Sequence, residues 1–238
     1  MSLNRHFLST VWVKTQILFL AVSACLPSAA FAKVSSVWPG YNGSDAATWL
    51  AVAPVEIRIE APTPLTGNNL QLLLALSGDG DLGELRQKAS QEFSDYLNQQ
   101  VQKRFGDFFI DERVHLVDEG ALLTLSTNFD VRIRQKISDI VSRKNYDLEK
   151  GIMIAYGKFH YRLEGPVVGA QALREGTVDI SELALQTNYS TLVPKDAGTV
   201  EDTTREATER LLADIAEEVL DQIENILEAD SLVVLARR

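Results

Sequence analysis

Cysteine is almost absent from this sequence, and positive charge is scarce. The 238 residues include one cysteine, Cys25, and 23 lysines and arginines against 33 aspartates and glutamates, a formal charge of −10. One cysteine can form neither an internal disulfide nor a cysteine-rich metal site. The acidic balance argues against nucleic acid as a partner, because binding to phosphates needs a basic surface.

Recognisable catalytic motifs are also missing. The sequence contains no G-x-S-x-G, S-x-x-K or H-E-x-x-H pattern, which removes the best-known serine acyl-transfer and zinc-protease motifs. His115 and His160 each precede a glutamate by four residues, but in a strand that spacing separates the side chains by about 13 Å. We therefore predict no catalytic residue, no cofactor and no metal site. A hydrolase with catalytic residues from distant positions remains an alternative, and His160 is the first residue to test.

One glycine-rich motif resembles a dinucleotide-binding loop. Residues 78–83, Gly-Asp-Gly-Asp-Leu-Gly, match the G-x-G-x-x-G spacing. Asp79 and Asp81 would, however, place two carboxylates beside a pyrophosphate. We interpret both acids as capping and helix-dipole partners at the start of a helix near Leu82.

Residues 1–32 have the three parts of a secretory signal peptide. They begin with a segment that has two basic residues and no acid, continue with an apolar run at 17–22, and end with Ala-Phe-Ala at Ala32. Pro27 interrupts the apolar stretch before it reaches the roughly 20 residues that cross a bilayer. We predict cleavage near Ala32, a periplasmic location and no transmembrane span after cleavage.

A second processing signal overlaps the first. Residues 22–25, Val-Ser-Ala-Cys, resemble the lipobox of bacterial lipoproteins, which implies lipidation of Cys25 as the first mature residue. This alternative would give the mature chain an apolar start. After the Ala32 cleavage the chain keeps 21 of its 23 basic residues and all 33 acidic ones, a net charge of −12.

Residues 33–53 are rich in turn formers and lack periodicity, so we expect a flexible lead-in. Residues 54–238 are expected to form a single α+β domain. Alternation at 55–60 predicts a strand that the prolines at 62 and 64 end, and the apolar run at 70–76 predicts a buried strand.

Helical spacing occurs in two long segments. Apolar residues recur every three or four positions over 84–105, and Gly106 is expected to cap that helix. Residues 108–110 and 114–117 then predict a strand or a bulged pair of strands. A second helix is predicted over about 200–229. Its apolar stripe lies opposite an acidic ridge formed by Asp214, Glu217, Asp221, Glu224 and Glu228.

Strict alternation of apolar and polar residues predicts strands at 121–133 and 153–163, and a shorter strand is expected at 177–180. The segment 138–151 predicts a long polar hairpin loop or a short helix. These elements favour an α+β, two-layer fold, in which two long amphipathic helices pack on one face of a mainly antiparallel sheet.

The two alternating strands also predict a surface. If they pair antiparallel, both apolar sets must face the same side, because the side-chain period of a strand is two. The opposite side then gathers six basic residues beside a single acid, Asp130. The predicted docking face is Arg132, Arg134, Lys136, Lys158, His160 and Arg162.

Several interpretations of this face remain open. It is either a plain solvated surface, a site for an anionic partner, or a contact with the acidic ridge of a second copy in a homo-oligomer. We predict a non-catalytic exported accessory or scaffold protein of the cell envelope that docks an envelope protein. A periplasmic carrier for an anionic glycan or lipid headgroup and a hydrolase without a recognisable motif are the alternatives.

Overall fold

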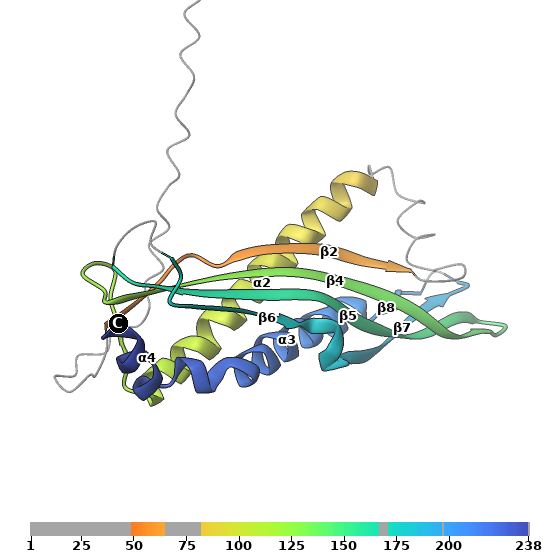
Figure 1. The fold of residues 1–238 in the computed structure, drawn as a ribbon. Coiled ribbons are helices and arrows are strands. Elements are labelled where there is room, and N and C mark those ends of the chain that lie inside the picture. Colours follow the sequence, from red (N-terminus) through yellow and green to blue (C-terminus); the bar gives the residue numbers. More distant parts are fainter. Residues whose placement is uncertain (1–48, 65–81, 167–170, 197, 238) are drawn as a thin grey trace, which may run out of the picture. The chain divides into compact units, whose positions relative to one another are not determined.

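The computed structural model describes residues 49–64, 82–166, 171–196 and 198–237, which form one sheet with helices (Figure 1). The predicted α+β class is confirmed. The strands are β1 Trp49–Val52, β2 Glu56–Pro64, β3 His115–Leu116, β4 Leu123–Ser142, β5 Tyr146–Glu164, β6 Arg174–Asp179, β7 Gln186–Pro194 and β8 Glu201–Asp202. The helices are α2 Leu82–Asp111, α3 Thr204–Leu227 and α4 Ala229–Ala236, with a 3₁₀ turn, η1, at Ile180–Leu183.

The sheet is mixed: most of its paired residues run antiparallel, but β1 and β2 add parallel pairs that the sequence did not predict. Its strand order is β3-β1-β4-β5-β7-β8, and in addition β2 pairs with β4 and β6 with β5. β1 and β2 run parallel to β4, while β5 is antiparallel to each of its neighbours. The parallel pairs arise because α2 lies between β2 and β4 in the chain, and parallel strands need such a crossover.

The long hairpin of β4 and β5 is the centre of the sheet. Its inner halves contain the two strands that alternation predicted, and alternate side chains from Leu123 to Gln135 are buried. The segment 138–151, predicted as a polar loop or short helix, instead continues both strands. This prediction was wrong because the outer half of β4 is mostly exposed, so that it forms a strand without an alternating apolar pattern.

α2 is longer than the sequence suggested. Gly106 does not cap it, and residues 108–110, predicted as a strand, form its last turns. Phe105 and Phe109 are 1% and 0% exposed and their rings lie edge to face at 6.5 Å. Burial of two phenylalanines outweighs the roughly 1 kcal/mol by which a glycine disfavours a helix interior.

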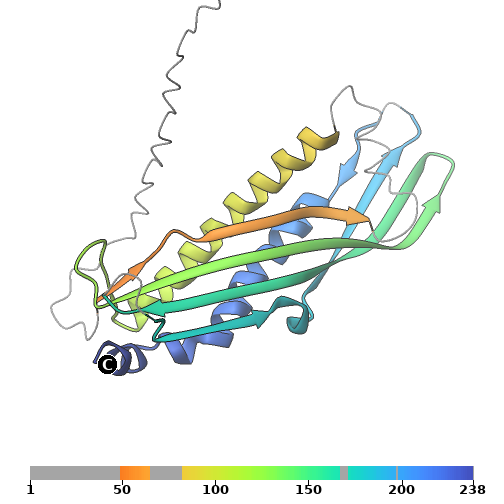
Figure 2. The same cartoon turned by 45° about the horizontal axis from the view of Figure 1, so that its top comes forward.

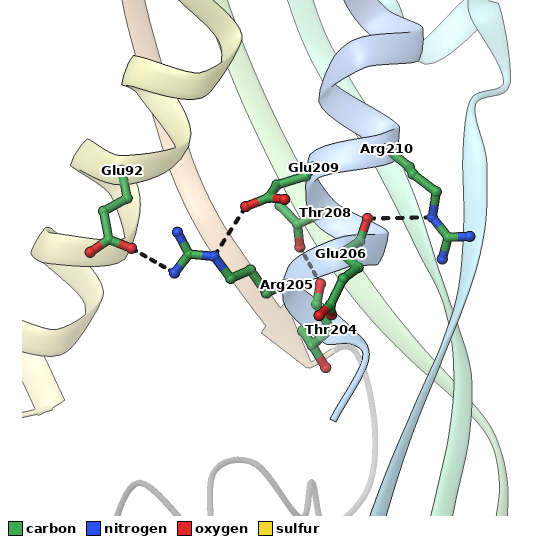
Figure 3. Close-up of polar contacts among 7 residues, drawn as sticks. All are labelled: Glu92, Thr204, Arg205, Glu206, Thr208, Glu209 and Arg210. Carbon is green, nitrogen blue, oxygen red and sulfur yellow. Dashed lines mark hydrogen bonds and ion pairs between the residues drawn. The ribbon is translucent and has the colours of Figure 1, made fainter. Parts of the chain in front are cut away.

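α2 and α3 lie side by side on one face of the sheet (Figures 1 and 2). The predicted apolar stripe of α3 is buried, including Ile215, Val219 and Ile223. Arg205 of α3 links the two helices at their rim, with Nη1 2.9 Å from Oε2 of Glu92 and Nε 3.0 Å from Oε1 of Glu209 (Figure 3). The described residues include one further helix, α4, which the sequence did not predict.

The start of the fold also differs from the prediction. Residues 49–52, which we assigned to the lead-in, form β1, and Leu50 is fully buried. β2 confirms the strand expected at 55–60, but it extends through Pro64. The strand expected at 70–76 and most of the glycine-rich motif lie outside the described residues, as do residues 1–48 with both processing signals.

Candidate functional site

The pairing of β4 with β5 decides which side chains share a face. Phe129 lies opposite Phe159, and their ring centroids are 4.5 Å apart in the core beneath the helices. Because side chains alternate along a strand, the even-numbered residues face away from the helices. All six predicted docking residues are exposed on this open face: Arg132, Arg134, Lys136, Lys158, His160 and Arg162.

The open face is not uniformly basic, because neighbouring strands add acids. The register places Arg58, Asp130, Lys158 and Asp179 in one row across β2, β4, β5 and β6, so charges of opposite sign alternate. Each residue in this row has an oppositely charged neighbour about 5 Å away. The expectation of a single acid among six cations was therefore wrong for the half of the open face where β6 pairs with β5.

Asp179 is held in its charged form. Its Oδ1 accepts a hydrogen bond from the backbone N–H of Ser181 at 2.9 Å. Hydrogen bonds with Ser181, with a smaller contribution from Lys158, hold the pKa of Asp179 below its ordinary value. The carboxylate beside Lys158 therefore stays charged to a lower pH than an ordinary aspartate does.

Two further predicted cations also have acidic partners. Arg162 Nε lies 2.8 Å from Oε1 of Glu164, and Glu175 of β6 is its cross-strand neighbour. Arg132 Nε lies 3.7 Å from Oε1 of Glu60. Both pairs are largely exposed to solvent, so their contribution is mainly to balance charge on this face.

A broad hollow of about 840 Å³ surrounds His160 on the open face. His160 Nδ1 is 2.8 Å from the Thr177 hydroxyl, and the Asn128 amide donates to Glu56 at 3.0 Å. The lining contains Glu56, Glu164 and Glu175 but one arginine, Arg162. This excess of carboxylates disfavours an anionic ligand in the hollow.

The hollow does not assemble a recognisable catalytic group either. The contact between His160 and Thr177 places a hydroxyl beside an imidazole, as nucleophilic catalysis requires. Among the described residues, no hydrogen bond links a carboxylate to this imidazole to orient it as a base. Nor do three or more metal-ligating side chains gather anywhere in the described segments.

The other half of the open face has a different composition. Arg132, Arg134 and Lys136 of β4 lie directly opposite Tyr156, Ile154 and Ile152 of β5. We call these six residues the cationic–apolar strip. The Arg134 guanidinium lies 5.4 Å from the centre of the Tyr156 ring, which is the geometry of a cation–π contact.

The strip combines free charge with accessible apolar surface. Arg134 and Lys136 form no ion pair with any described residue. Ile152, Ile154 and Tyr156 are only half-buried, although they lie on the solvent side of the sheet. The sequence prediction of this face rested on its charged positions and did not include these three residues. The available signal was that 152–156 is apolar at both odd and even positions.

No protein-family model and no curated protein matches this chain. A neuraminyllactose-binding hemagglutinin homolog from Helicobacter pylori is similar at 9% identity, with coverage of 83% of this chain and 92% of that chain and a TM-score of 0.44. A minor lipoprotein from Acinetobacter baumannii is 11% identical, with coverage of 75% and 93% and a TM-score of 0.29. These TM-scores are too low to establish a common fold.

Within the described segments, no helix combines the length and apolar character that a membrane crossing needs.

Proposed function

We propose that this protein is an exported, non-catalytic accessory or scaffold protein of the cell envelope that docks another envelope protein on the cationic–apolar strip. The signal-peptide sequence of residues 1–32 supports export. The strip supports docking, because it leaves Arg134 and Lys136 without an acidic partner among the described residues, beside half-buried Ile152 and Ile154.

The two kinds of side chain in the strip have different roles in binding. Exposed ion pairs contribute only about 0.2–1 kcal/mol each, so charge mainly orients the partner and speeds its approach. Burial of Ile152, Ile154 and Tyr156 supplies affinity at roughly 25 cal/mol per Å² of apolar surface. The matching partner is therefore a protein surface that carries carboxylates beside apolar side chains.

The test is affinity capture from solubilised envelopes, with the captured proteins identified by mass spectrometry. The test variant, Arg134→Glu with Lys136→Glu, reverses the two unpaired cations of the strip. The matched control, Lys158→Glu with Arg162→Glu, makes the same change of net charge in the half where neighbouring strands supply acids. We expect one partner to be lost with the test variant and with high salt, and to be retained with the control.

Two outcomes contradict the proposal. Equal capture by the wild type and the test variant would remove the strip as the docking site. Binding to vesicles of anionic lipid, with no protein captured in a variant-dependent way, would replace the protein partner by a lipid surface. Thermal unfolding of both variants checks that each has kept its fold.

A further inference from the structure

Beyond Arg210, the exposed side of α3 carries acids and no lysine or arginine. Its buried residues face the sheet and α2, and five acids face away from them. No lysine or arginine occurs between residues 211 and 236. The acidic ridge predicted from the sequence is exposed along this side of the helix: Asp214, Glu217, Asp221, Glu224 and Glu228.

Most acids of this ridge have no basic partner among the described residues. Glu217 Oε2 lies 2.6 Å from Nη1 of Arg104 on α2. The other four acids form no ion pair with a described residue. Their mutual repulsion would fall if a row of cations were placed against the ridge.

The same chain presents such a row, but on the opposite side. α2 and α3 cover one face of the sheet (Figure 2), whereas Arg132, Arg134 and Lys136 project from the other. The ridge and the strip therefore cannot meet within one molecule. They can meet between two molecules.

We propose that a second copy of this chain docks its acidic ridge on the cationic–apolar strip. This inference rests on the proposed function, since it uses the strip as a docking surface, and it names one partner for it. The strip's unpaired cations and the ridge's unpaired acids are complementary in sign. The aliphatic parts of the glutamate side chains cover Ile152 and Ile154.

The position of the two surfaces decides the kind of assembly. A two-fold dimer needs both complementary surfaces within one self-complementary patch. Here they lie on opposite faces, so each copy uses its ridge for one neighbour and its strip for another. Contacts of this head-to-tail kind produce rings or open chains.

Ionic strength has opposing effects on this association. Residues 33–238 have a net charge of −12, which repels copies over long distances at low salt. At 0.15 M salt the screening length is about 8 Å, so distant charges are screened while ridge and strip side chains in contact still attract. High salt then weakens the contact itself.

The test is sedimentation velocity of residues 33–238 over a range of protein concentration at 0.15 M salt. We expect the wild type to form assemblies that grow with concentration. Arg134→Glu with Lys136→Glu on the strip, or Asp221→Lys with Glu224→Lys on the ridge, should each weaken association about tenfold or more. The variant with all four substitutions should regain association, because its strip is then acidic and its ridge is basic.

A matched control separates local pairing from net charge. Asp196→Lys with Glu201→Lys makes the same change of net charge as the ridge variant, at exposed acids that follow β7 and lie in β8 rather than on α3, and should not weaken association. A wild type that stays monomeric at every concentration, or a four-substitution variant that fails to regain association, overturns the inference. If self-association fails but the strip still captures another envelope protein, the proposed function stands without self-association.

Discussion

At the scale of single residues, the most demanding feature is a carboxyl group buried beneath the sheet. Glu149 has no exposed surface, and its Oε1 accepts a hydrogen bond from the Tyr189 hydroxyl at 2.8 Å. A buried carboxyl group is strongly destabilising unless it is hydrogen-bonded. Burial, together with Glu149, raises the pKa of the Tyr189 hydroxyl well above its ordinary value. The hydroxyl therefore keeps the proton that it donates.

This shift predicts a loss of stability at alkaline pH. In the unfolded chain Tyr189 ionises near its ordinary pKa of about 10, whereas in the folded chain it stays protonated. Stability is therefore fully present below pH 10 and falls above it by about 1.4 kcal/mol per pH unit. Tyr189→Phe should reduce this slope and also cost about 1–3 kcal/mol at pH 7, because Glu149 loses a buried donor.

Urea unfolding at pH 7 and between pH 10 and 11 measures both effects. Tyr156→Phe is the matched control, since it removes the same atom from the open face and leaves Tyr189 in place. An alkaline slope that is identical in the wild type and in Tyr189→Phe would contradict the assignment.

At the scale of elements, the β4–β5 pair depends on one position where the two backbones come very close. Gly157 has a φ of +130°, and a β-carbon at this position would collide with the carbonyl oxygen of Asp130 on β4. The backbones of β4 and β5 can therefore come this close only because residue 157 has no side chain. The charged row lies next to this approach, since Asp130 is the cross-strand neighbour of Lys158.

Gly157→Ala should destabilise the protein by about 3–5 kcal/mol, because backbone strain and overpacking add. The matched control is Gly120→Ala. Gly120 has a φ of +73°, but nothing lies within 4 Å of an added β-carbon, so only backbone strain of about 1–2 kcal/mol is expected. Chemical denaturation of both variants measures the difference, and equal losses would show that the close approach is unimportant.

Single helices and strands were predictable where the burial of one face gave the sequence a regular spacing of apolar residues. The inner halves of β4 and β5 were predicted because one face is buried and the other is exposed, and α3 was predicted for the corresponding reason. The end of α2 was missed, because the local tendency of Gly106 to end a helix was outweighed by the burial of Phe105 and Phe109.

At the scale of the whole molecule, the site was only half predictable. Alternation alone showed that the basic residues of β4 and β5 share a face. It could not show that β2 and β6 place acids beside them, since Glu60 and Asp179 are far in sequence from Arg132 and Lys158. Such long-range neighbours are set by sheet order, which local patterns do not encode.

Processing of the amino terminus is the prediction that concerns the whole chain. We expect the mature protein to begin with a free Lys33, and Cys25→Ala to leave processing and location unchanged. Intact-mass spectrometry of the protein purified from its native envelope measures both. A lipidated Cys25 at the amino terminus would contradict this prediction and establish the lipid-anchored alternative.

The place of β1 in the sheet has a consequence for the order of folding. β1 lies between β3 and β4, and Leu50 is the register partner of Leu123. The amino terminus leaves a ribosome or a secretion channel first. β1 therefore emerges long before its partner strands β3 and β4. Contacts between such distant positions slow folding, so Leu50 stays accessible to chaperones until β4 has emerged.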